Sequence, residues 1–163
     1  MLKENLISLY ESLHKVGHLS GVKFAYAMSK NIAMIKSEML ALEESLKFSP
    51  AYTTYDEERA ALAEVHAKKD DKGKAETRKN DNGTTAYVIE DQAAFDKEHD
   101  KLKKKHKLAI EAREKQIKEY ESLLKEPSTL SLHKVKLSEV PEGINVQQLS
   151  SIFEIIDDDQ AAK

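Results

Sequence analysis

The sequence contains no cysteine and no tryptophan, and only five glycines and three prolines among its 163 residues. Without cysteine, disulfides, thiolate zinc sites and cysteine nucleophiles are excluded. The glycines form neither G-x-x-x-x-G-K nor G-x-G-x-x-G, and no serine stands in G-x-S-x-G. No apolar run approaches the roughly 18 residues of a membrane span, and the N-terminus does not read as a signal peptide. We therefore expect no membrane partner.

Charge is abundant but balanced in sign. Charged residues make up 34% of the chain and aromatic residues 6%, and the formal net charge is -3 with a pI of about 6.1. A chain without an overall basic field is not expected to attract nucleic acid. So many charges and so few aromatics predict a thin, elongated core in one domain of residues 1–163.

The histidines do not form a recognisable metal motif. Only Glu11-Ser12-Leu13-His14 matches the Glu-x-x-His pattern, whereas a di-iron bundle needs two such motifs and two further glutamates. No His-Glu-x-x-His zinc motif occurs. We accordingly predict no catalytic, cofactor-binding or metal-binding residue, no cofactor, and a protein that is not an enzyme.

The stretch Ala75 to Ile89 predicts a β-hairpin around which the helices are arranged. Asn82-Gly83 is typical of a two-residue type I′ turn, which would place Thr77 opposite Val88. Threonine, tyrosine and valine in the second half favour a pleated strand. Because helical patterns precede and follow this hairpin, the flanking helices should run antiparallel.

The N-terminal region, residues 1–68, predicts helices. The first spans Leu2 to Val16, with Gly17 as a left-handed C-cap, and Ser20 is the predicted N-cap of the second. Ser49-Pro50 predicts either a new helix to about Lys68 or a kink in one long helix. The second helix carries an apolar row at three- and four-residue steps, predicted to pack on the later charged helix: Phe24, Met28, Ile32, Ile35, Met39, Leu42 and Leu46.

The second half of the chain predicts a long charged helix over 91–125, with Asp91 as its N-cap. Leu130 to Leu137 predicts a third strand, and Asn145 with Gln148 has the form of a capping box before a short helix. Residues 129–157 should therefore hold a strand and a C-terminal helix. The predicted fold is mainly α (α+β): an antiparallel helical hairpin or coiled coil with a small β-hairpin or three-stranded β element.

Two segments are candidate contact surfaces. Consecutive lysines spread around a helix, and arginine, which suits bidentate phosphate recognition, is scarce here. A solvated helix is therefore the preferred interpretation of the first cluster, with nucleic-acid or acidic-partner contact as a minority one. This cluster comprises Lys101, Lys103, Lys104, Lys105 and Lys107. The second segment is the hairpin, with Lys79, Asn82, Gly83 and Tyr87 as candidate protein contacts.

Several stretches together resemble a loose group of small helical proteins encoded by tailed bacteriophages and prophages. They are GVKFAYAMSKNIAMIKSEMLALEESLK, the segment from Tyr55 to Lys68, AYVIEDQAAFDKEHDKL, and LHKVKLSEVPEGINVQQLSSI. The resemblance covers nearly the whole chain and carries over no catalytic residue. It implies a viral origin and a location in the cytoplasm of an infected bacterium or in a virion.

Three functions follow as hypotheses. The first is a non-catalytic module that binds a host defence or replication protein through a helical surface or the hairpin edge. The second is a structural or assembly component of the virion, with self-association through the 91–125 helix as a homo-oligomer. The third is a nucleic-acid-binding accessory protein acting through the lysine cluster. The expected partner is a host or phage protein.

Overall fold

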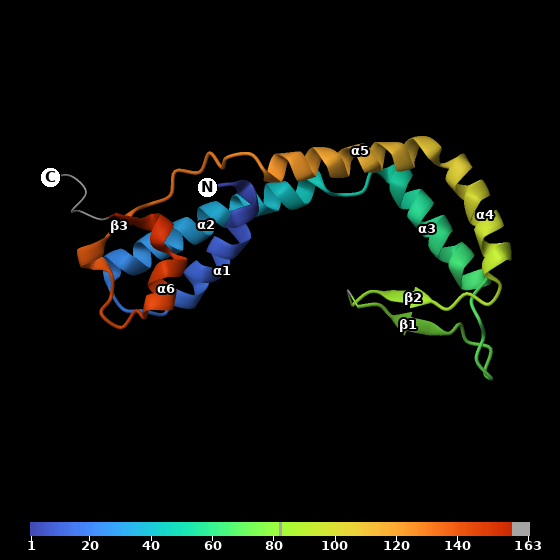
Figure 1. Ribbon diagram of the computed structural model, residues 1–163, viewed down its shortest axis with the longest axis horizontal. Coiled ribbons are helices and arrows are strands. Elements are labelled where there is room, and N and C mark those ends of the chain that lie inside the picture. Colours follow the sequence, from blue (N-terminus) through green and yellow to red (C-terminus); the bar gives the residue numbers. More distant parts are fainter. Residues whose placement is uncertain (82, 158–163) are drawn as a thin grey trace. The chain divides into compact units, whose positions relative to one another are not determined.

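The computed structural model describes residues 1–81 and 83–157 (Figure 1). It is mainly helical with a small amount of β structure, as predicted. The helices are α1 (Leu6–Val16), α2 (Val22–Ser45), α3 (Pro50–Val65), α4 (Gln92–Lys105), α5 (Lys107–Leu124) and α6 (Val146–Ser151). The strands are β1 (Thr77–Lys79), β2 (Thr85–Tyr87), β3 (Val135–Lys136) and β4 (Ile156–Asp157).

Contacts within the chain group it into two compact units. Unit 1 consists of Met1–Leu46 and the described residues from Glu119 on, and unit 2 consists of Lys47–Lys118. The predicted single domain stays a prediction, and each unit is described here by itself. The boundary at 46–47 lies just after the end of α2, and α3 begins as a separate helix at Pro50.

Unit 1 is built on the apolar row of α2. Ile35 and Phe24 are fully buried, and the row is covered by α1 and by the C-terminal segments. Helix α1, which lies nearer in sequence and carries its own leucine stripe, is the main helix that covers this row; packing of the row on the 91–125 helix stays a prediction. The buried cluster, within the described residues, is Leu6, Leu9, Leu13, Val16, Phe24, Ala27, Met28, Ile35, Val135, Ile152 and Ile155.

One buried polar residue attaches the C-terminal segment to α2. The Asn31 side chain has no solvent exposure; its Nδ2 donates to the His133 carbonyl at 2.9 Å, and its Oδ1 accepts from the His133 N–H at 2.7 Å. Within the predicted strand segment 130–137, the observed strand is Val135–Lys136, which pairs in parallel with Ile156–Asp157. The predicted third strand over 130–137 therefore does not join the hairpin.

Two predicted helix ends in unit 1 are also wrong. Gly17 has a φ of -63° and is right-handed rather than left-handed. Helix α2 is preceded by Gly21 instead of being capped by Ser20, and Gly21 has a φ of 132°, which side chains rarely adopt. The capping box of Asn145 with Gln148 is confirmed in both directions.

In unit 2 the hairpin is present, but its register differs from the prediction by one residue. Thr77 lies opposite Tyr87, not Val88. The Asn80 N–H donates to the Thr84 carbonyl, and the Gly83 N–H donates back to the Asn80 carbonyl. Gly83 has a φ of 79°, as in the longer hairpin loops that end in a left-handed glycine. Asn82 lies outside the described residues.

A third backbone segment completes the β element of unit 2. The Lys68 N–H donates to Val88 at 2.7 Å, the Val88 N–H to Glu76 at 3.0 Å, and the Glu76 N–H to Lys68 at 2.8 Å. These three bonds link the segments around 68, 76 and 88 in a ring. A two-stranded hairpin alone is only marginally stable. These bonds give partners to its backbone groups at Glu76 and Val88.

Candidate functional site

Helices α3 and α4 form the antiparallel hairpin of unit 2. Ser49 accepts a hydrogen bond from the Tyr52 N–H and Pro50 occupies the first turn, while Asp91 accepts from the Ala94 N–H. Both predicted helix starts are confirmed. Cross-helix bonds join His66 to Glu98 and Glu58 to His106. The later residue of the α3 region, His66, pairs with the earlier residue of the α4 region, Glu98, so the two helices run antiparallel, as Figure 1 shows.

The inner face of this hairpin is lined by aromatic and histidine rings. Tyr55 is the buried residue of α3, and its ring centroid lies 5.7 Å from that of His106. On α4, Phe95 lies 5.3 Å from His99 and 5.9 Å from His66, centroid to centroid. Ring contacts of this kind add modestly to burial. They replace the leucine packing that a longer apolar stripe would provide.

The N-terminal end of α3 is joined to α5 by a cation–π contact. Helix α4 ends at Lys105, and the backbone of the next residue, His106, departs from helical geometry, so the predicted 91–125 helix is two helices. The Arg113 guanidinium lies 4.7 Å from the centroid of the Phe48 ring and 5.8 Å from that of Tyr52. Gln116 donates to the Lys47 carbonyl at 3.1 Å. These contacts hold the middle of α5 against the α3 N-terminus.

Glu58 is the polar centre of the hairpin. Its carboxylate accepts from Lys105 Nζ at 2.7 Å and lies 3.1 Å from His106 Nε2. The hydrogen bond from Lys105 is the largest cause that lowers the pKa of the Glu58 carboxyl, and the hydrogen bond from His106 is the next largest. The carboxylate therefore stays ionised through the neutral range and orients two side chains of the facing helix.

His99 is the histidine that lacks a carboxylate partner in this hairpin. Its Nε2 lies 3.2 Å from the Tyr55 hydroxyl. Burial is the main cause that lowers the pKa of His99, and the positive charges of Lys103 and Arg59 lower it further. The Asp100 and Asp96 carboxylates act in the opposite direction but do not outweigh these causes. His99 thus favours its neutral form where it packs.

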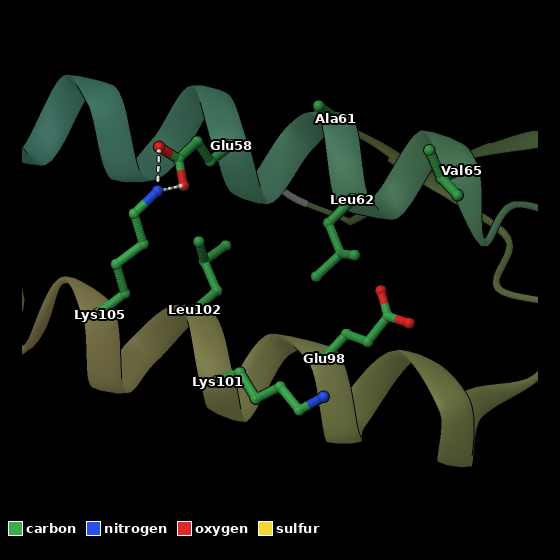
Figure 2. A pocket seen from close by; sticks show the side chains of 8 residues that line it. All are labelled: Glu58, Ala61, Leu62, Val65, Glu98, Lys101, Leu102 and Lys105. Atoms are coloured by element: carbon green, nitrogen blue, oxygen red, sulfur yellow. Dashed lines mark hydrogen bonds and ion pairs between the residues drawn. The ribbon is translucent and has the colours of Figure 1, made fainter.

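An open groove runs along one face of the hairpin, with a volume of about 570 Å³ (Figure 2). Leu62 and Leu102 point toward one another from the two helices, and the Glu58–Lys105 pair closes one end. Val65 is 74% exposed, although it is a large apolar residue. The lining residues are Glu58, Ala61, Leu62, Val65, Glu98, Lys101, Leu102 and Lys105.

The structure places the five lysines of the predicted cluster on the surface of α4 and at the start of α5, all of them exposed. Lys103 lies 3.4 Å from Asp100, Lys105 lies 2.7 Å from Glu58, and Lys107 lies 3.6 Å from Glu111. Lys101 lines the groove, whereas Lys104 does not. Neighbouring carboxylates thus weaken the field of the cluster; its contact role stays a prediction.

The hairpin candidates lie apart from this groove in the sequence and in their contacts. Lys79 is exposed at the end of β1, and Tyr87 is half-buried at the end of β2. Gly83 supplies the left-handed position of the loop, and Asn82 lies outside the described residues. Their role in protein contact also stays a prediction.

The two glutamates that line the groove were not predicted from the sequence. Glu58 and Glu98 were not singled out, because each is one carboxylate among many on charged helices. The available signal was spacing: residues 58, 61, 62 and 65 share one face of α3, and residues 98, 101, 102 and 105 share one face of α4. Only the pairing of α3 with α4 brings these two faces together.

The described residues contain neither a metal-binding cluster nor a membrane-spanning helix. Within residues 1–81 and 83–157, no group of three or more histidine and carboxylate side chains is placed to hold a metal ion. In the same part of the chain, no helix is both long enough and apolar enough to cross a membrane.

Comparison of the chain with protein-family models, with curated proteins and with solved structures finds no significant match.

Proposed function

We propose that this chain is a non-catalytic protein-binding module whose α3–α4 groove receives an α-helix of a protein partner. The observation that carries the proposal is the open groove itself, with the Leu62 and Leu102 side chains at its centre and Val65 exposed at one end. Exposed apolar surface framed by charged residues is typical of interaction sites.

The shape of the groove favours a helix over an extended peptide. Two antiparallel helices present a trough parallel to their axes, and an amphipathic helix fills such a trough with residues spaced three and four apart. Ala61 is small, which permits close approach of a backbone. Glu58, Glu98, Lys101 and Lys105 supply both signs of charge for orienting the incoming helix.

The resemblance to phage proteins supports a partner from the infected bacterium, such as a defence or replication protein, and action in its cytoplasm. A virion component is the second candidate function. The charge along α4, which is more negative in its first part and positive in its last, favours this function because such a helix can pair with an antiparallel copy of itself. Nucleic-acid binding receives less support, because carboxylates lie beside Lys103, Lys105 and Lys107.

The absence of cysteine makes a direct test available, because one introduced cysteine is unique. Val65→Cys places a thiol at the groove, and Ala60→Cys places one at an exposed position of α3 outside the lining. Each variant carries a thiol-linked photo-crosslinker in lysate of cells that express the chain. We expect Val65→Cys, and not Ala60→Cys, to form an adduct with one defined helical segment.

The crosslinked peptides, identified by mass spectrometry, decide the outcome. Adducts of equal yield and identity from both positions would contradict the proposal, as would the absence of any protein adduct from Val65→Cys. A Val65→Lys variant provides the complementary measurement. Because Val65 is mostly exposed, this change should leave the circular dichroism spectrum intact while abolishing competition with the crosslinked partner.

A further inference from the structure

The charges that line the groove are ordered along α4. Glu98 lies before Leu102 and Lys105 lies after it, so the two oppose each other across the centre of the groove. Among the other exposed residues of the helix, Asp96 and Asp100 lie in its first part together with Lys97, and Lys101, Lys103 and Lys104 lie toward its end. A helix with this order carries a negative end and a positive end.

We propose that a second copy of this chain occupies the groove, with its own α3–α4 hairpin packed face to face and antiparallel. The inference rests on the proposed function, because it names the partner of the same groove. In this arrangement Glu98 of each copy faces Lys105 of the other, and the Leu62 and Leu102 side chains of both copies meet at the twofold axis. The product is an antiparallel four-helix bundle.

Self-complementarity distinguishes a second copy from an unrelated helix. A twofold axis presents the same patch to itself, so each charged position must meet its opposite across the axis. Of the four charged lining residues, Glu98 and Lys105 meet this condition, because they lie at similar separations from Leu102 on either side. Ala61 lies beside Leu62 on the α3 side of the groove, where its small side chain lets the two α3 helices approach closely.

Charge reversal with mixing tests this arrangement on the full chain, with molar mass measured by sedimentation over a range of protein concentrations. We expect the wild type to dimerise. Glu98→Lys and Lys105→Glu should each raise the dimer dissociation constant by about tenfold or more. In each variant residues 98 and 105 carry the same charge, so two like-charged pairs face each other across the interface. An equimolar mixture of the two variants should dimerise again, since each lysine at 98 meets a glutamate at 105 of the other variant.

Matched variants control for loss of folding. Lys104→Glu makes the same charge change next to Lys105 but outside the groove, so its dimer should match the wild type. Ala61→Cys should oxidise to a disulfide-linked dimer, whereas Ala60→Cys should not. The cysteine pair involves neither Glu98 nor Lys105, so it still tests the interface if Lys105→Glu fails to fold.

A wild type that stays monomeric at high concentration would overturn the inference, as would a mixture that associates no better than the single variants. The proposed function fails separately. If the wild type is monomeric but Val65→Cys still crosslinks a helix of another protein, only the second-copy inference is lost. If it is monomeric and Val65→Cys yields no adduct, both are lost.

Discussion

The two units of this chain are stabilised in different ways. Nearly all of the buried apolar residues belong to unit 1, where α1, α2 and the C-terminal segments enclose a common cluster. In unit 2 the buried apolar residues, within the described part of the chain, are Tyr55 and Ala67. Helices α4 and α5 contain no buried residue. Unit 2 instead relies on ring contacts, histidine–carboxylate pairs and a lysine–glutamate pair.

This difference has consequences for how each unit should respond to change. Burial of apolar side chains is insensitive to salt and to moderate changes of pH. Exposed ion pairs contribute little and are screened by salt, and a histidine changes its charge within the accessible pH range. Unit 1 should therefore be sensitive to side-chain volume, and unit 2 to solution conditions. Unit 2 also carries the groove, where the apolar residue Val65 is exposed.

Truncation in the core of unit 1 should have the largest effect. Ile35→Ala removes packed methyl groups from a fully buried site and should cost about 2–5 kcal/mol of unfolding free energy. Leu102→Ala is the matched change in unit 2, where the side chain is half-buried, and should cost less. Denaturant unfolding followed by circular dichroism measures both.

Two further variants sharpen this measurement. Ile35→Asp should prevent folding of unit 1, because it places an unpaired carboxylate in an apolar cluster. Lys103→Ala, on the exposed face of α4, should change stability by less than about 0.5 kcal/mol. If Leu102→Ala proved as costly as Ile35→Ala, the contrast drawn here between the two units would be wrong.

A substitution with an expected effect of intermediate size tests the buried polar residue Asn31 in unit 1. Asn31→Ala removes both hydrogen bonds to the His133 backbone and leaves a donor and an acceptor without their partner. The expected cost is about 1–3 kcal/mol. Hydrogen exchange should show faster exchange at the His133 amide, while Ser45→Ala, at the C-terminal end of α2, serves as the control. Unchanged protection at His133 would show that Asn31 does not hold this segment.

The smallest expected effect is a pH dependence in unit 2. Because the pKa of His99 is lowered in the folded chain, the unfolded chain binds the proton first as the pH falls. Stability should therefore decrease as the pH drops below the ordinary histidine value of 6.5, and level off below the pKa of the folded state. Tyr55, Lys103, Arg59, Asp100 and Asp96 are the groups that act on this ring.

His99→Gln isolates this contribution, since glutamine does not titrate but still offers hydrogen bonds to the Tyr55 hydroxyl. Thermal unfolding of the wild type and of the variant should be compared above and below pH 6.5, because the remaining histidines are common to both. We expect the variant to lose less stability on acidification. If both proteins lose the same amount, His99 does not contribute to the pH dependence.

Local signals in the sequence predicted the starts of α3, α4 and α6 but not that of α2, and they missed long-range pairings. Ser49-Pro50, Asp91 and Asn145 act within one turn of helix, so a single stretch of sequence contains both partners of each bond. The hairpin register failed by one residue, because Asn82-Gly83 fits either a two-residue turn or a longer loop ending in Gly83. The apolar row of α2 predicted burial of Ile35 correctly but not its covering helix.

The sequence by itself determined a mainly helical chain with a β-hairpin between residues 75 and 89, and it determined which face of α2 is apolar. These properties follow from periodicity and from turn and cap residues, which act over a few positions. Only the tertiary structure decided that α1 covers α2, that His133 is bound to Asn31, and that Glu58 and Glu98 flank one groove. Such pairings join residues far apart in the chain, and many charged residues of similar spacing could have formed them.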